Sequence, residues 1–296
     1  PVRDELRSSY DHMYQPDNMT GKGLSRKDKL FDLDEPDGIE VEYFSKRTWK
    51  SETVLCLLPG DKGANPRQIK AFGVVEHQKA WQFGMRERRL ARYARTEYSW
   101  GTEMDGFNSR YLDYVALADD VPGYSQNGQL FDWRPIPGGV WFQLDQDITW
   151  KDGETHWLAL RKPDGRLSGP YQAVKLSGSN EVQISGQLDF MPDLSGRQEF
   201  PLWMFGTGEE WSFPALVTDI KPQGTEKVSM TGRNYDPRVY MDDDSVAPTA
   251  GNDPVVGMSL AASGSGDALN ADRSMLYFKI GDVVRLSVTA SEYQIR

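Results

Sequence analysis

The feature that most constrains the fold of this chain is a regular recurrence of turn signals between residues 122 and 234. Glycine and proline clusters return about every 8 to 12 residues, the spacing at which short strands alternate with tight turns. The clearest turns are Pro137-Gly138-Gly139, Lys151-Asp152-Gly153, Lys162-Pro163-Asp164-Gly165 and Pro222 to Gly224. The strands predicted between them are residues 140–144, 156–161, 173–176, 181–184, 215–220 and 227–231. This pattern predicts a barrel or a sandwich.

The part before these turns combines strands with one long helix. Residues 39–44 alternate apolar and acidic side chains, and residues 53–58 are apolar and β-branched, which predicts two strands joined by a turn. A helix is predicted over 76–95. We expect one face to pack and the arginines of the segment to lie on the opposite face, which would be solvated or would face another subunit. Its expected packing face consists of Ala80, Phe83, Gly84, Leu90, Ala91 and Ala94. The arginines are Arg88, Arg89, Arg92 and Arg95.

A chain of 296 residues is long enough for at least two hydrophobic cores. The predicted fold class is mainly β with one packed long helix (α+β), arranged as several small barrel-like or sandwich-like domains. The predicted division is an extended polar lead-in at 1–36, an α+β domain at 37–110, a β-barrel or sandwich domain at 111–240, a linker at 241–254, and a partial β segment at 255–296. We expect the last segment to be truncated or to be completed by another chain.

Charge and cysteine content exclude several classes of protein. The 34 basic and 44 acidic residues give a net charge of −10, which argues against specific nucleic-acid binding and suits a surface past which DNA slides. Cys56 is the single cysteine, so no intramolecular disulfide can form, and its apolar neighbours predict a buried strand thiol. The chain shows no apolar run of about 20 residues and no signal peptide, so we expect a soluble protein made in the cytoplasm.

Residues that could carry chemistry do not form a recognisable motif. His12, His77 and His156 lie in unlike segments, and neither a zinc-protease motif, a nucleophile elbow nor a phosphate-binding glycine loop occurs. The acidic clusters are Asp242-Asp243-Asp244, Asp119-Asp120 and Glu209-Glu210. We predict no catalytic, cofactor-binding or metal-binding residues and no cofactor, with the triple aspartate solvating a linker. A pair of carboxylates from distant residues stays open as an alternative.

Several tryptophans fall in the β-rich part, among them Trp133, Trp141, Trp150, Trp157 and Trp211. Exposed tryptophans stack on sugars, whereas those beside aliphatic strand residues pack in a core or at a subunit seam. We predict the second arrangement for Trp141 and Trp157.

The order of these segments resembles the tip attachment or host specificity protein J family, the central tail tip proteins of long-tailed bacteriophages. The resemblance covers about residues 36–244, and its most specific part is the closing hairpin that ends in Asn234-Tyr235-Asp236. The other matching segments are Val41-Glu42-Tyr43 with Trp49, residues 69–73, Ala80, Ala91-Arg92-Tyr93, and residues 112–117, 122–128, 202–206, 216–222 and 228–233. The chain departs from the family at Leu112-Asp113, where a Gly-Asp is usual, and in residues 249–296, which do not look like the fibronectin-type domains that often follow.

The resemblance implies a structural, non-enzymatic hub built from barrel domains with a helix packed on each. It implies a homotrimer in the virion tail tip, assembled in the host cytoplasm, which connects the tail tube to the receptor-contacting tip and takes part in host attachment and DNA passage. The implied partners are other tail tip and distal tail proteins, the tape measure protein, and a host receptor bound through regions outside this chain. The alternative from another class is a carbohydrate-binding or carbohydrate-active β-rich protein.

Overall fold

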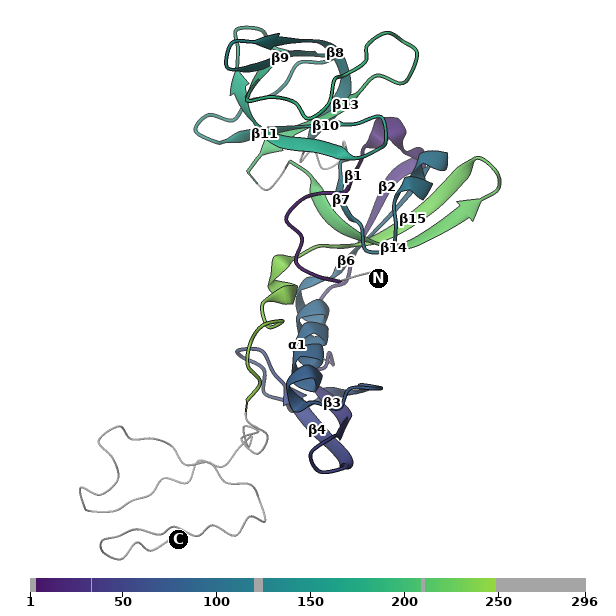
Figure 1. Ribbon diagram of the computed structural model, residues 1–296, viewed down its shortest axis with the longest axis vertical. Coiled ribbons are helices and arrows are strands. Elements are labelled where there is room, and N and C mark those ends of the chain that lie inside the picture. Colours follow the sequence, from purple (N-terminus) through teal and green to yellow (C-terminus); the bar gives the residue numbers. More distant parts are fainter. Residues whose placement is uncertain (1–3, 33, 120–124, 209–210, 249–296) are drawn as a thin grey trace, which may run out of the picture. The chain divides into compact units, whose positions relative to one another are not determined.

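The computed structural model describes residues 4–32, 34–119, 125–208 and 211–248. This part of the chain is mostly β-structure with one α-helix, which confirms the predicted fold class (Figure 1). The chain divides into two compact units, which are treated separately below. Unit 1 contains the residues up to 31 together with 90–240, and unit 2 contains 32–89 together with the residues from 241 onward. None of the helices described has the length and apolar character needed to cross a membrane.

Unit 1 begins with a six-stranded sheet whose strands come from distant parts of the sequence. Its order is β1-β7-β14-β15-β6-β2. The strands are β1 (His12–Tyr14), β2 (Thr20–Asp28), β6 (Thr96–Thr102), β7 (Tyr114–Leu117), β14 (Phe213–Gln223) and β15 (Lys227–Asn234). Strand β1 runs parallel to β7, and the other neighbours are antiparallel. The short 3-10 turns are η1 (Pro16–Asn18), η2 (Met104–Asn108) and η3 (Pro237–Tyr240).

The second part of unit 1 is a closed six-stranded barrel, which is one of the two architectures predicted. The predicted strands at 215–220 and 227–231 belong instead to the six-stranded sheet, as β14 and β15. Its strands are β8 (Gln126–Ile136), β9 (Gly139–Leu144), β10 (His156–Arg161), β11 (Leu167–Lys175), β12 (Glu181–Ser185) and β13 (Leu202–Thr207). The chain leaves the sheet after β7 and returns to it with β14, so the barrel is an insertion between two neighbouring sheet strands. Alternating apolar residues fill its interior, among them Phe142, Leu158 and Trp203.

Unit 2 is a three-stranded sheet packed on the first part of the helix. The sheet order is β4-β3-β5, with β4 (Lys50–Cys56) antiparallel and β5 (Pro66–Lys70) parallel to β3 (Gly38–Ser45). Ile39, Val41 and Tyr43 point from β3 into the core, as the alternating pattern predicts.

The helix α1 (His77–Tyr93) buries a different face from the one predicted. Its buried residues are Ala80, Trp81, Gly84, Met85 and Arg88. Phe83 and Ala91, which were expected to pack, are exposed. The rows 80-84-88 and 81-85 follow the helical spacing of four, and Gly84 lies directly over Cys56 and Val41, where a β-carbon would not fit. Close approach of the sheet to Gly84 therefore selects this face.

The predicted domain boundaries need correction. Residues 12–28 are extended, as expected of the lead-in, but they supply β1 and β2 of the unit 1 sheet. The boundary at 110/111 falls inside unit 1, because β6 pairs with β15 and β7 pairs with β14. Strand pairing satisfies backbone groups whatever their separation in the sequence, so local composition does not reveal it. The predicted partial β segment at 255–296 and residues 249–254 of the predicted linker lie outside the described residues.

Candidate functional site

The junction between the barrel and the sheet of unit 1 gathers the largest group of buried polar residues. Its apolar part packs small side chains of β7 and β10 against larger ones of β1 and β13. These residues are Met13, Ala116, Ala118, Ala159, Leu167, Leu202, Met204 and Trp211. Alanines allow the two layers to approach closely, and the polar residues lie beside this contact.

Arg161 is the charged centre of the junction. It ends β10, it is 8% exposed, and its Nη2 donates to Asp105 Oδ2 at 2.6 Å. Its Nε donates to the carbonyl of Met13 on β1 at 3.2 Å. One guanidinium thus joins the barrel, η2 and the sheet, which suits the forked geometry of arginine. Burial raises the pKa of Asp105, and the positive charge of Arg161 opposes this shift.

Two further polar side chains of the N-terminal segment are fully enclosed in the same junction. The Tyr14 hydroxyl lies 2.6 Å from Ser109 Oγ, and burial raises the pKa of Tyr14 to about 12, so the phenol stays neutral near pH 7. Gln15 is 0% exposed and donates from Nε2 to the carbonyl of Gly128 in β8 at 3.1 Å. The Gln15 bond attaches the N-terminal segment to the barrel strand β8, and the Tyr14 bond holds β1 beside Ser109, the residue that follows η2.

His12 is the one histidine near this cluster, and its surroundings do not form a catalytic triad. Its Nε2 lies 3.5 Å from Asp113 Oδ2, while its Nδ1 has no hydrogen-bond partner in the described structure. A triad needs a hydroxyl or thiol bonded to the free ring nitrogen, and that atom is missing here. The pair is arranged to hold β1 beside β7, with which His12 is in register at Val115.

The outer edge of the junction is acidic. We call Asp17, Glu103, Asp105 and Glu199 the acidic rim; these carboxylates lie within electrostatic range of one another and of Arg161. Partial desolvation raises the pKa of Glu199, and the negative charges of the other rim residues raise it further, against the effect of Arg161. The rim therefore carries more negative charge than its one buried arginine offsets.

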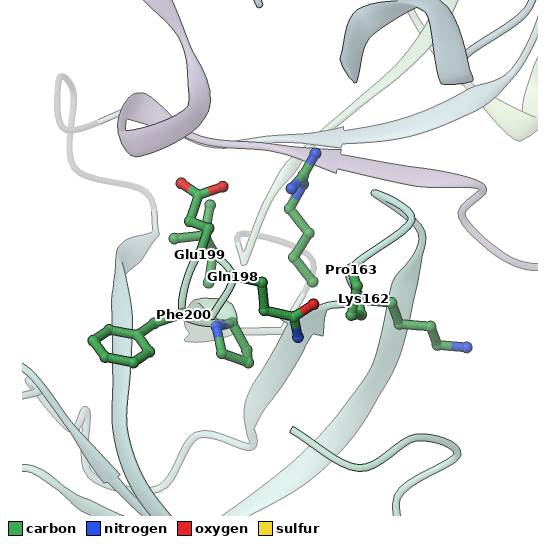
Figure 2. A pocket seen from close by; sticks show the side chains of 8 residues that line it. Lys162, Pro163, Gln198, Glu199 and Phe200 are labelled. Carbon is green, nitrogen blue, oxygen red and sulfur yellow. The ribbon is translucent and has the colours of Figure 1, made fainter. Parts of the chain in front are cut away.

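A small hollow opens beside the rim. It has a volume of about 70 Å³ and is lined by residues 161–163 and 198–202. Figure 2 shows Glu199 directed toward the purple N-terminal segment, while Phe200 points the other way. Pockets that enclose small-molecule substrates measure roughly 300 to 1,000 Å³, so this hollow is too small to surround a sugar or a nucleotide. The rim is consequently a surface rather than a pocket.

The residues singled out in the sequence are held apart and are used structurally. His156 accepts from the Lys151 backbone N–H at 3.0 Å and stacks on Phe205, and His77 lies 3.2 Å from the Tyr43 hydroxyl. Cys56 is 0% exposed, which confirms a buried strand thiol. Within the described ranges, no three His, Cys, Asp or Glu side chains are placed to hold a metal ion.

The triple aspartate does not simply solvate a linker. Arg86 of α1 pairs with Asp243, and Arg89 donates from Nε to Asp242 Oδ2 at 2.5 Å. Gln78 of the same helix binds the backbone of the segment at the carbonyl of Ser245 and at the N–H of Ala247. We call residues 241–248 the strap. Of the four arginines predicted to face solvent, Arg89 is thus paired within unit 2, and Arg88 forms a buried pair with Asp61. Arg92 and Arg95 belong to unit 1, where both lie over the ring of Phe31. Two of the acidic clusters lie partly or wholly outside the described residues: residue 120 of the first, and both residues of the second, 209–210.

Most of the tryptophans singled out in the sequence pack inside unit 1. Trp141 and Trp211 are 9% and 6% exposed, and Trp133, Trp150 and Trp157 are partly buried against apolar clusters. Trp203, which was not singled out, is 0% exposed at the centre of the barrel. In the described part of the chain the tryptophan that stands free is Trp49 of unit 2, at 78%.

Sequence reasoning missed the junction residues. Arg161 could have been noticed, because it is a lone charge at the end of a largely apolar strand (residues 156–161), and such a charge indicates a buried ion pair or contact. No protein-family model and no curated protein matches the chain.

Proposed function

We propose that this chain is a structural, non-enzymatic subunit of a bacteriophage tail tip, a baseplate hub that connects the tail tube to the receptor-contacting tip. Its place would be the virion, after assembly in the host cytoplasm as a homotrimer with distal tail proteins and the tape measure protein. Host attachment and DNA passage are the processes it would serve. The order of segments that resembles the protein J family is the sequence basis of this proposal.

The structural observation that supports it most is the insertion of a closed barrel into the sheet of unit 1. The barrel enters between β7 and β14, and Arg161, Gln15 and the alanine-rich contact attach it to the sheet. An insertion tied in this way by buried charge and packing transmits force without bending at a hinge. Such a module suits a load-bearing part of an assembly.

The alternative, a carbohydrate-binding or carbohydrate-active protein, has less support. A sugar platform needs exposed aromatic faces in a groove, but the tryptophans of the β-rich unit are buried or partly buried. A glycosidase needs two carboxylates on either side of a sugar, and the hollow beside Glu199 is too small to hold one.

Two measurements on the purified chain separate the proposals. Negative-stain microscopy and mass photometry at high protein concentration should show ring-shaped trimers if the chain is a hub subunit. A glycan array and a reducing-end assay on cell-wall polymers should be blank. Glycan binding coupled to release of reducing ends would reject the hub and support the alternative.

A further inference from the structure

The tip of the β3–β4 hairpin in unit 2 exposes three aromatic side chains. We call Phe44, Trp49 and Phe72 the aromatic patch; they are 48%, 78% and 102% exposed. The Phe44 and Trp49 rings meet edge to face, with centroids 6.4 Å apart. Residues 71–75 run beside the hairpin, because the Ala71 N–H donates to the Glu42 carbonyl at 2.9 Å. Contiguous exposed apolar groups of this kind mark interaction surfaces.

The backbone presents Trp49 at some conformational cost. Its φ is +56°, in the left-handed region that a bulky residue rarely adopts. Such a conformation is retained where the side chain it presents has a use. Tryptophan and arginine are the side chains that most often dominate binding at interfaces, and Arg47 is two residues away.

The aromatic patch also carries a small excess of positive charge. Lys46, Arg47, Lys50 and Lys70 lie on or beside it, and the acidic residues that accompany them are Glu42, Glu52 and Glu76. Lys46 pairs with Glu76 and Lys70 with Glu42, while Arg47 is near Glu52. The hairpin thus presents a basic and aromatic surface on a chain whose net charge is −10.

The acidic rim of unit 1 has the complementary character. Asp105 and Glu199 interact with the buried Arg161, and Glu103 and Asp17 act on Glu199. Two apolar side chains of η2 stand exposed: Met104 at 53% and Phe107 at 47%. Crowding of like charge and desolvation disfavour the ionised carboxylates, so an incoming cation would relieve a repulsion already present.

We propose that the aromatic patch of one copy docks on the acidic rim of a second copy, with Trp49 against Met104 and Phe107 and with Arg47 and Lys50 at the carboxylates. This rests on the proposed function, since it names a contact of the ring. The two surfaces are different, so the contact is heterologous and repeats head to tail.

The expected strength sets the design of the test. Three aromatic side chains bury on the order of a few hundred Å², which is below the roughly 1,000 Å² of a stable interface. A single contact is therefore weak, and closure of a ring strengthens it because the last contact forms within one assembly. The contact should be captured covalently, at high concentration.

The first experiment is cross-linking of variants of the full chain that each carry one added surface cysteine. A Lys50→Cys chain is mixed with a Glu103→Cys chain and a short bismaleimide, while Cys56 stays unreactive because it is buried. The mixture should yield about ten times more cross-linked dimer than either variant alone. The same excess is expected over two controls, which are a mixture of Lys175→Cys with Glu103→Cys and the unmodified chain. Equal yields in all samples, or efficient cross-linking of Lys50→Cys to itself, would overturn the proposal.

The second experiment separates this contact from the hub itself. Trp49→Ala and Glu103→Lys/Glu199→Lys should each abolish trimers, and mixing the two should restore dimers but no closed rings, because only one of the possible contacts is intact. Trimers that persist in both variants would reject this contact and leave the hub standing. If cross-linked dimers form but no trimer is seen, the contact between the aromatic patch and the acidic rim is supported and the proposed trimeric ring is rejected. Circular dichroism of each variant checks that the fold is unchanged.

Discussion

The barrel of unit 1 and the α+β layer of unit 2 enclose their hydrophobic cores in different ways. The barrel closes on itself, so its strands pair on both sides and its interior is filled by apolar side chains. The described part of unit 2 has three strands, with β4 and β5 at the edges, and the first part of α1. Its core is bordered by the buried Arg88–Asp61 pair and its helix is covered by the strap. A closed sheet is stabilised by burial, whereas an open layer also needs charge pairing.

Truncation of the barrel core should have the largest effect. Trp203 is 0% exposed, and its Nε1 donates to Asp145 Oδ1 at 2.9 Å and to the Gln129 carbonyl at 3.0 Å. Trp203→Ala removes the packing and takes the indole donor away from Asp145 Oδ1, while the Gln129 carbonyl keeps the Asp145 N–H at 3.3 Å. The change should lower the free energy of unfolding by about 5 kcal/mol. Urea denaturation followed by circular dichroism measures it. Phe131→Ala, at a side chain 68% exposed, is the control and should cost little.

Removal of one partner of the buried ion pair in unit 2 should rank second. Arg88 Nη2 lies 2.7 Å from Asp61 Oδ1, and both side chains are about one-tenth exposed. Arg88→Met leaves a buried carboxylate without its partner and should cost about 3 kcal/mol. Adding Asp61→Asn to the same chain removes that charge and should recover part of the loss. If the double variant is less stable than Arg88→Met, pairing is not what stabilises this border.

The strap should contribute less, and its contribution should depend on salt. Arg86 and Asp243 are 21% and 32% exposed, so their interaction is partly screened. A double-mutant cycle with Arg86→Ala and Asp243→Ala should give a coupling of about 1 kcal/mol at low salt and a smaller one at 1 M salt. A coupling that does not change with salt would indicate that packing, rather than charge, holds residues 241–248.

The smallest effect concerns pH at the acidic rim. The pKa of Glu199 is raised in the folded chain, so the native state binds its proton more readily than the unfolded state and gains stability as the pH falls toward the ordinary glutamate value. Glu199→Gln should therefore raise stability near pH 7 by less than about 0.5 kcal/mol and flatten its pH dependence just above the normal carboxyl range. Thermal unfolding from pH 4 to 7 measures this. Glu226→Gln, an exposed site distant in sequence, serves as the control.

Local pattern predicted the strands of the barrel better than the boundaries of the units. Turn spacing and apolar content located residues 140–144, 156–161 and 181–184, and in β12 the buried residues Val182 and Ile184 alternate as expected of a strand. Helical spacing located α1 and placed Ala80 and Gly84 on its buried face. It chose Phe83 and Ala91 in place of Trp81 and Met85, because it counted small residues and could not know which side of the helix the sheet covers. Arg88 was placed in solvent for the same reason, although it is buried against Asp61.

The sequence alone determined that this chain is mainly β with one helix and that its single cysteine is buried. These properties depend on composition and on periodicities of two and 3.6 residues, which act between near neighbours. Only the tertiary structure decided that residues 12–28 complete a sheet, that Arg161 ties the barrel to it, and that the Asp242-Asp243 pair binds α1. Such pairings join residues far apart in the chain, and each side chain has many equivalent partners until the backbone brings one of them within reach.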